Sequence, residues 1–285
     1  MYNFPIGAIV ESFGLPTVKA IEKAASIGAS GVQLYASRGE TTPDNLDKTK
    51  RRELLDVVKS NGLVFSALCG DFGMGFGDKE RNPELIEKSK RVLDMAKELE
   101  TNVVTTHIGV VPEDPEHERY KIMQEACYEL AQYADSIDSH FAVETGPETS
   151  ETLKKFLDSL GSTGVAVNLD PANLVMVTGD DPVKAVHNLK KYIVHTHAKD
   201  GIRVKVGNPE FIYRVVHPVP EEYNGVRYYQ ELPLGKGSVD FPKYLAALDE
   251  IGYKGFLTIE RECGEDPAAD ITMAADFLRN IIKNA

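Results

Sequence analysis

One ten-residue stretch, GSTGVAVNLD at positions 161–170, contains the unit from which the fold is built. It begins with a glycine turn, continues through apolar and β-branched residues, and ends at Asp170. The same turn, with two glycines three positions apart, recurs at 28–31 and 252–255, each time directly before a hydrophobic run. Glycine commonly follows a helix C-terminus, and a short β-branched run is typical of a buried strand. The repeat therefore predicts a regular succession of helix, turn and strand.

Outward from this stretch, eight apolar runs alternate with eight segments of helical periodicity. The predicted strands cover residues 6–11, 31–36, 63–69, 102–107, 140–145, 164–170, 192–198 and 255–261. The predicted helices cover residues 18–27, 48–61, 83–99, 115–136, 150–160, 182–190, 241–251 and 267–282. Such alternation indicates a parallel sheet, and eight units close into a barrel. We therefore predict one α/β domain over residues 1–285, a (β/α)8 TIM barrel with a long insertion at about 202–237.

Two local features bear on this prediction. Four of the predicted helix starts carry a side chain that can cap a helix, followed by proline, which is favoured at the first helical position. The capping residues are Asn82, Asp114, Asp181 and Asp266. A doubly wound open sheet would show the same alternation, but the first strand-to-helix junction, residues 11–16, lacks the glycine fingerprint of a dinucleotide site.

The composition argues against several classes of protein. The chain has 32 Lys and Arg against 44 Asp and Glu, a formal net charge of −12 and a pI near 5.1. Phosphate backbones and anionic membranes are bound by clustered positive charge, so we expect neither a nucleic-acid nor a membrane partner. The three cysteines form no CxxC pair, and we find neither a signal peptide nor a bilayer-length apolar run. We expect a cytoplasmic protein, and a homo-oligomer is compatible with this composition.

Polar side chains end several of the predicted strands. The carboxyl ends of barrel strands meet at one mouth, where the active site lies. The polar residues at these ends are Asp71, His107, Glu144, Asp170, His197 and Glu260. Burying so many of them unpaired would be costly, and a bound cation would offset that cost. The last four, from successive strands, suit one divalent metal ion, with Mn²⁺ the first choice and Mg²⁺, Co²⁺ and Zn²⁺ left open.

Strand periodicity leaves some assignments open. His195 and His197 point to the same side of their strand, as do Glu260 and Glu262, so either member of each pair could be the ligand. His107 is expected to line the site, as a substrate contact or a hydrogen-bond donor behind the ligands. Lys199 and its neighbour Asp200 either orient His197 or form an ordinary salt bridge.

Five motifs stand out in the second half of the chain: VETG at 143–146, NLDPAN at 168–173, HAKD at 197–200 followed by Arg203, PLGKG at 233–237, and LTIE at 257–260. Jointly and in this order they resemble the xylose-isomerase-like sugar phosphate isomerase/epimerase family. The resemblance is strongest from about residue 140 to residue 285. It implies that His197 and Glu260 are the ligands of their respective pairs.

The resemblance also implies roles for individual residues. Glu144 and Glu260 would be both metal ligands and proton-transfer groups, facing opposite sides of the substrate. Arg203 would hold substrate oxygens. Asn173 stands where many relatives have a histidine, and we expect an amide contact to the substrate in its place.

The function expected from these features is a metal-dependent isomerase or epimerase of a small sugar, phosphorylated or not, which acts by proton abstraction and enediolate formation. A metal-dependent lyase or dehydratase acting on an inosose or a keto-glycoside begins with the same proton removal and stays open. A non-catalytic metal- or sugar-binding subunit is a third alternative. The apurinic-site endonucleases of the superfamily assemble several zinc ions, and Asn173 and the absence of an Asp-x-His after His197 remove ligands which that reaction needs.

Overall fold

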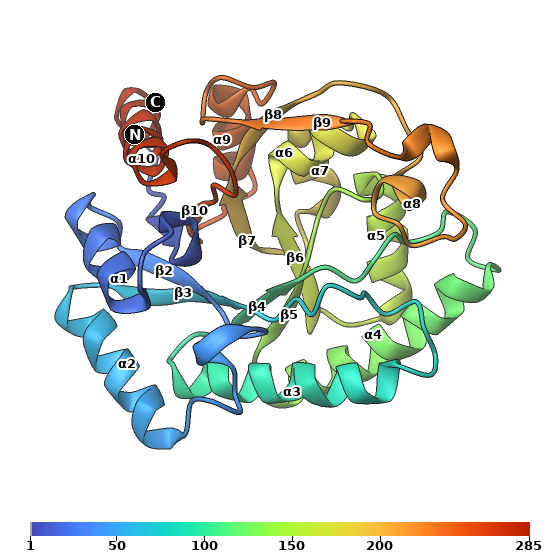
Figure 1. Cartoon of the computed structure of the whole chain (residues 1–285), viewed down its shortest axis with the longest axis horizontal. Helices are drawn as coiled ribbons and strands as arrows, with labels where there is room; N and C mark the ends of the chain where they lie inside the picture. Colours follow the sequence, from blue (N-terminus) through green and yellow to red (C-terminus); the bar gives the residue numbers. More distant parts are fainter. Residues whose placement is uncertain (1) are drawn as a thin grey trace.

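A computed structural model describes residues 2–285 of the chain. Within these residues, eight parallel strands close into a barrel in the order β1-β2-β3-β4-β5-β6-β7-β10, with β10 pairing back onto β1 (Figure 1). The strands are β1 (Ile6–Ile9), β2 (Gly31–Tyr35), β3 (Val64–Cys69), β4 (Val103–Thr106), β5 (His140–Glu144), β6 (Val165–Leu169), β7 (Ile193–Ala198) and β10 (Leu257–Ile259). The structure confirms the predicted (β/α)8 TIM barrel.

Helices surround the barrel on the outside (Figure 1). The longer ones are α1 (Thr17–Ser26), α2 (Lys48–Ser60), α3 (Asn82–Glu98), α4 (Glu118–Ser136), α5 (Ser150–Leu160), α7 (Pro182–Leu189), α9 (Phe241–Glu250) and α10 (Pro267–Asn284). Shorter turns are η1 (Glu11–Phe13), η2 (Gly39–Thr41), α6 (Pro171–Asn173), the π-helical η3 (Leu174–Thr178), α8 (Pro209–Ile212) and η4 (Glu221–Tyr223). The two ends of the chain lie side by side, and Tyr2 N donates a hydrogen bond to Ile282 O at 3.2 Å.

Helix α5 illustrates why these segments fold as helices against the barrel. Its large apolar residues recur at positions that share one helical face, and all four are buried: Leu153, Phe156, Leu157 and Leu160. The side chain of Thr149 caps the N-terminus by accepting a hydrogen bond from Thr152 N. The apolar face and the cap together fix where the helix lies and where it begins.

The glycine turn quoted above has a physical cause at both of its glycines. Gly161 ends α5 with a φ of +63°, a conformation that residues with a side chain adopt only at a cost. Gly164 lies against α4, where an added Cβ would come 2.2 Å from Ala131 O. The second glycine therefore allows the strand to approach the neighbouring helix closely.

The strand register places the carboxyl ends of neighbouring strands at the same height along the barrel. Glu144 at the end of β5 pairs with Asn168 of β6, and His197 of β7 pairs with Thr258 of β10. Because parallel strands all point the same way, the side chains that end them are presented at one mouth of the barrel.

The predicted insertion forms a separate hairpin. Strands β8 (Asp200–Arg203) and β9 (Tyr229–Leu232) pair antiparallel, and α8 and η4 lie between them (Figure 1). The hairpin leaves the barrel directly after β7, so it stands next to the mouth. Its position is that of the loops which commonly carry binding residues in barrels of this type.

Two of the four predicted helix caps are wrong. Asp181 and Asp266 cap α7 and α10 as expected. Asn82 instead lies inside α3, where its side chain donates to Phe76 O. Asp114 forms a turn with Glu116, and α4 begins only at Glu118. In both cases the side chain has a partner in the preceding loop, which competes with the cap.

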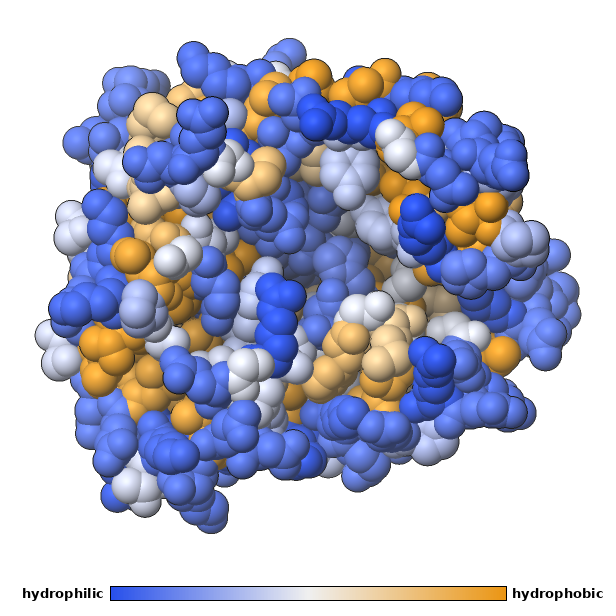
Figure 2. All heavy atoms as spheres, in the orientation of Figure 1, coloured by the Kyte–Doolittle hydropathy of each residue, from blue (hydrophilic) through white to orange (hydrophobic). Residues whose placement is uncertain are grey.

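The face that carries the mouth is hollowed near its centre, and the residues within the hollow are largely hydrophilic (Figure 2). Among residues 2–285, no helix combines the length and the apolar character needed to cross a membrane.

Candidate active site

Four side chains meet where β5, β6, β7 and β10 end. Each offers one ligand atom, and these atoms all lie within 4.8 Å of one another: Glu144, Asp170, His197 and Glu260. All four residues are buried, with between 0 and 7% of their surface exposed. The structure thus brings together the four residues that the sequence nominated as metal ligands, from four adjacent strands of the barrel.

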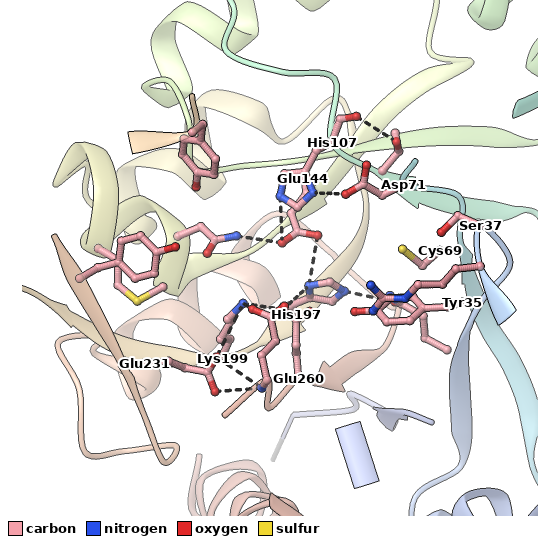
Figure 3. A pocket seen from close by; sticks show the side chains of 18 residues that line it. Tyr35, Ser37, Cys69, Asp71, His107, Glu144, His197, Lys199, Glu231 and Glu260 are labelled. Carbon is pink, nitrogen blue, oxygen red and sulfur yellow. Dashed lines mark hydrogen bonds and ion pairs between the residues drawn. The ribbon is translucent and has the colours of Figure 1, made fainter. Parts of the chain in front are cut away.

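His197 lies at the centre of this cluster. Its Nδ1 atom is 3.2 Å from Glu260 Oε2, 3.6 Å from Glu144 Oε2 and 3.6 Å from Asp170 Oδ2. Figure 3 shows the ring between the two glutamates. Burial opposes the protonated ring, but the surrounding carboxylates outweigh burial and hold the pKa of His197 well above its ordinary value. The cluster therefore attracts positive charge strongly.

Two carboxylate oxygens of the cluster lack a hydrogen-bond donor. Asp170 Oδ2 and Glu260 Oε2 are buried and, among the described residues, accept no hydrogen bond, although cationic side chains lie at ion-pair distance. Three carboxylates sharing one buried space are costly without a compensating cation. Three carboxylates and one imidazole fit a single divalent metal ion, and these four residues could hold it.

Gln33 and Asn168 contact the His197 ring. Gln33 Oε1 lies 3.2 Å from His197 Nε2, and Asn168 Nδ2 lies 3.2 Å from the same nitrogen and 3.4 Å from Nδ1. Gln33 also donates from Nε2 to Thr105 Oγ1 across the barrel. An acceptor at Nε2 keeps a proton there, so Nδ1 is the nitrogen that would give up its proton to bind a metal ion among the carboxylates. Sequence reasoning missed Gln33, although a polar residue inside the apolar run GVQLY was a usable signal.

Glu144 is held by two side-chain amides. Asn173 Nδ2 donates to Glu144 Oε1 at 2.8 Å, and Asn168 Nδ2 lies 3.3 Å from Glu144 Oε2. The close approach of Asn173 explains Gly146, where an added Cβ would lie 2.4 Å from Asn173 Cβ. Asn173 lines the cavity, and its amide bonds to a cluster carboxylate; its contact with the substrate stays a prediction.

His107 faces the cluster from β4. Its Nδ1 atom pairs with Asp71 Oδ2 at 3.1 Å, and its Nε2 atom lies 3.6 Å from Glu144 Oε1 (Figure 3). Burial opposes the protonated ring, but the carboxylates of Glu144 and Asp71 outweigh it and raise the pKa of His107 to about 10. His107 is therefore a cationic donor on the wall of the cavity.

Lys199 forms a salt bridge rather than an orienting contact. Its Nζ atom lies 2.6 Å from Glu262 Oε2, 3.1 Å from Glu260 Oε2 and 4.0 Å from Glu231 Oε2. Glu231 comes from β9 of the hairpin and also pairs with Arg261. Sequence reasoning missed Glu231, because only the pairing of β8 with β9 brings it to the mouth.

The two glutamates of the cluster are held as carboxylates. Burial favours the neutral acid, but Lys199 and His197 outweigh it at Glu260 and hold its pKa well below the ordinary value. At Glu144 the charges of His107 and His197 have the same effect and lower the pKa. Both glutamates can therefore accept a proton at neutral pH.

A cavity of about 280 Å³ opens over the cluster, and Glu144, His107, Asn173, His197 and Glu260 line it. This volume suits one small ligand.

Arg203 does not line this cavity. Its guanidinium lies against Gly179, where an added Cβ would come 2.2 Å from Nη2, and it lines a neighbouring cavity with Glu148. The pairing of Arg203 with Tyr229 in the hairpin sets this direction. The structure thus separates Arg203 from the cluster that the sequence placed it with.

The model of one family, xylose isomerase-like TIM barrel, matches residues 21–281. The chain belongs to the xylose isomerase-like TIM barrel family. A solved structure of a xylose isomerase domain protein from Planctomyces limnophilus has a TM-score of 0.79 at 24% identity, with 99% of each chain covered. That likeness agrees with the barrel described above.

Two of the curated proteins that this chain resembles are named as enzymes. An inosose dehydratase of Clostridium beijerinckii is 27% identical over 155 residues, which are 53% of this chain and 49% of the relative. A candidate L-ribulose-5-phosphate 3-epimerase of Haemophilus influenzae, SgbU, is 23% identical over 245 residues, or 82% of this chain and 79% of the relative. The match to the inosose dehydratase thus spans only about half the length of that protein.

Proposed function

We propose that this chain is a divalent-metal-dependent isomerase or epimerase that acts on a ketose or a related sugar. The observation that carries the proposal is the pair of buried glutamates on either side of His197. Glu144 Oε2 and Glu260 Oε2 lie 3.6 Å and 3.2 Å from Nδ1 of that ring, at the base of the cavity. Both are carboxylates, so both can take a proton from a carbon next to a carbonyl group.

The reaction proposed needs two proton transfers. One glutamate removes the proton next to the carbonyl, and the other returns a proton, to the opposite face in an epimerisation or to the adjacent carbon in an isomerisation. Asn173 and Asn168 fix the Glu144 carboxylate, and Lys199 fixes that of Glu260. A divalent cation in the cluster would supply the positive charge that stabilises the developing oxyanion.

The cofactor proposed is a single divalent ion held by Glu144, Asp170, His197 and Glu260. Three carboxylates and one nitrogen favour Mn²⁺ or Mg²⁺, and Co²⁺ and Zn²⁺ accept the same donors. We propose Mn²⁺ as the working metal, because it tolerates the imidazole better than Mg²⁺ does.

A lyase is the second candidate, and one observation favours it. Loss of water after proton removal needs an acid to protonate the departing hydroxyl group. His107 lines the cavity opposite Glu260 in the view of Figure 3, is oriented by Asp71, and has a pKa raised to about 10 by Glu144 and Asp71 against the effect of burial. The similarity to an inosose dehydratase supports the same candidate.

The test uses the Mn²⁺-loaded protein and its Glu144→Gln and Glu260→Gln variants. Deuterium exchange from solvent into ketoses and inososes is followed by proton NMR, which also separates epimers from dehydrated products. We expect each variant to lose at least about 100-fold in turnover while its circular dichroism stays unchanged. Glu125→Gln, at an exposed position of α4, is the matched control and should keep full activity.

Retained turnover in both glutamate variants would rule out the proposed acid/base pair. A wild-type protein that binds metal and sugar but exchanges no proton would instead point to the third alternative, a non-catalytic binding subunit.

A further inference from the structure

The walls of the cavity carry more negative than positive charge. Among the described residues, five carboxyl groups line it: Asp71, Glu144, Glu231, Glu260 and Glu262. Asp170, in the cluster beneath, is a sixth. The cationic side chains on the same walls are Arg38, His107 and Lys199; His197 also lines the cavity and is counted as neutral, because a metal ligand must give up its proton. One divalent cation would therefore still leave the site with net negative charge, even with His107 counted as protonated.

Two of these cationic side chains, Lys199 and His107, already have carboxylate partners. Lys199 is 95% buried and lies within ion-pair distance of three carboxylates, those of Glu231, Glu260 and Glu262. His107 pairs with Asp71. The guanidinium of Arg38 is exposed at the rim and stacks 4.3 Å above the Tyr35 ring. An added phosphate group would have to compete with these contacts.

A carboxylate of the chain itself fills the place where barrels of this type frequently bind phosphate, the loops that follow the last two strands. The backbone N–H groups of Gly235, Gly237 and Val239 all point at Asp200 and donate to its two oxygens at 3.0, 2.9 and 3.1 Å. An added Cβ at Gly237 would lie 2.1 Å from Asp200 Oδ1, so the fit is tight. Backbone N–H groups of this kind can bind phosphate when they have no other acceptor, but here all three donate to Asp200.

Arg203 does not change the excess of negative charge on the cavity walls. Its Nε and Nη2 atoms are buried and have no hydrogen-bond partner among residues 2–285. However, Arg203 lines the neighbouring cavity, together with Glu113, Glu210 and Glu148, whose pKa burial raises to about 8. Arg203 therefore does not offset the negative charge on the walls of the first cavity.

From these observations we propose that the site takes an uncharged polyhydroxy ketone, a free ketose or a cyclic analogue, and rejects sugar phosphates. This inference rests on the proposed function and narrows its substrate. It favours the chemistry of the inosose named for one relative over that of the sugar phosphate named for the other.

The experiment compares matched pairs, D-fructose with D-fructose 6-phosphate and D-ribulose with D-ribulose 5-phosphate, together with an inosose. Deuterium exchange catalysed by the Mn²⁺-loaded full chain gives kcat/KM for each compound. We expect exchange with at least one free compound, and a kcat/KM at least about tenfold lower for its phosphorylated partner. A higher kcat/KM for a phosphorylated member overturns this inference and leaves the proposed function standing. No exchange with any compound overturns the proposed function, and this inference falls with it.

Two further measurements test the electrostatic cause. Glu262→Gln removes a rim carboxylate that pairs with Lys199 at 2.6 Å, and should raise the phosphorylated-to-free ratio of kcat/KM at least about threefold. The control variant Glu125→Gln, remote on α4, should leave that ratio unchanged, and equal ratios in both variants contradict the proposal. Inorganic phosphate titrated into the metal-free wild type should show no Kd below about 1 mM, and tighter binding overturns the inference.

Discussion

Gln33 offers the sharpest test of how the cluster is built. It is 99% buried, and its Oε1 atom lies 3.2 Å from His197 Nε2. Metal binding requires Nδ1 of His197 to be free of its proton while Nε2 keeps one. Gln33 holds the proton at Nε2 by accepting from it. Asn168 Nδ2 is a donor that lies 3.2 Å from Nε2 and 3.4 Å from Nδ1, so it can pair with whichever of the two nitrogens is unprotonated.

Replacement of Gln33 by methionine keeps the volume of the side chain and removes the acceptor. Without that acceptor, nothing at position 33 holds the proton on Nε2, and the tautomer that leaves Nδ1 free to bind a metal ion is no longer favoured. Loss of such a contact behind a metal ligand typically costs about 10- to 100-fold in affinity, or about 1.4–2.7 kcal/mol. We expect the Kd for Mn²⁺, measured by isothermal titration calorimetry, to rise by that factor in Gln33→Met.

The matched control is Gln33→Glu, which keeps an acceptor at the same position and should bind Mn²⁺ at least as tightly as the wild type. Nitrogen NMR of the Zn²⁺-loaded protein should show metal at Nδ1 of His197 in the wild type. A folded Gln33→Met variant whose Mn²⁺ affinity stays within about twofold of wild type would refute the reasoning, because it would show that Gln33 does not select the tautomer.

The remaining predictions concern stability. Burial raises the pKa of Glu148 from 4.5 to about 8, so the folded protein keeps a proton that the unfolded chain releases between these values, and stability falls as pH rises through that window. Glu148→Gln should therefore unfold at a higher temperature than the wild type above pH 8, and at a similar one near pH 5; parallel pH profiles would contradict this. Removal of bound metal by a chelator should lower the melting temperature, because the cluster carboxylates then repel one another; restored Mn²⁺ at about 100 times its Kd should return about 2.7 kcal/mol. A melting temperature that does not change when millimolar Mn²⁺ is added would argue against a metal site.

Local patterns were enough to predict the barrel and the position of its candidate site. Strands and helices followed from periodicity, and the rule that parallel strands end at one mouth brought together Glu144, Asp170 and one member of each pair His195/His197 and Glu260/Glu262. Both depend only on neighbours along the chain and on the closed topology. The family resemblance selected His197 and Glu260, which the structure places in the cluster.

Residues whose surroundings depend on distant pairing were beyond this reasoning. Gln33 meets His197 across the barrel, and Glu231 reaches Lys199 only through the hairpin. Arg203 lines a second cavity for the same reason, since the direction of its side chain is set by the register of β8 against β9, and its contact with substrate oxygens stays a prediction. Asn82 and Asp114 failed as caps because partners in the preceding turns compete for their side chains.

The hairpin β8–β9 separates the residues that shape the cavity from the residues of the proposed metal cluster. The four clustered side chains all come from the barrel ends, whereas Tyr229 and Glu231, which also line the cavity, belong to a segment that pairs with none of the barrel strands. Evolution could thus exchange this one segment between relatives and change which molecule is admitted, while the chemistry beneath it stays intact. The same segment could be grafted from one relative onto another in the laboratory to change which substrate is admitted.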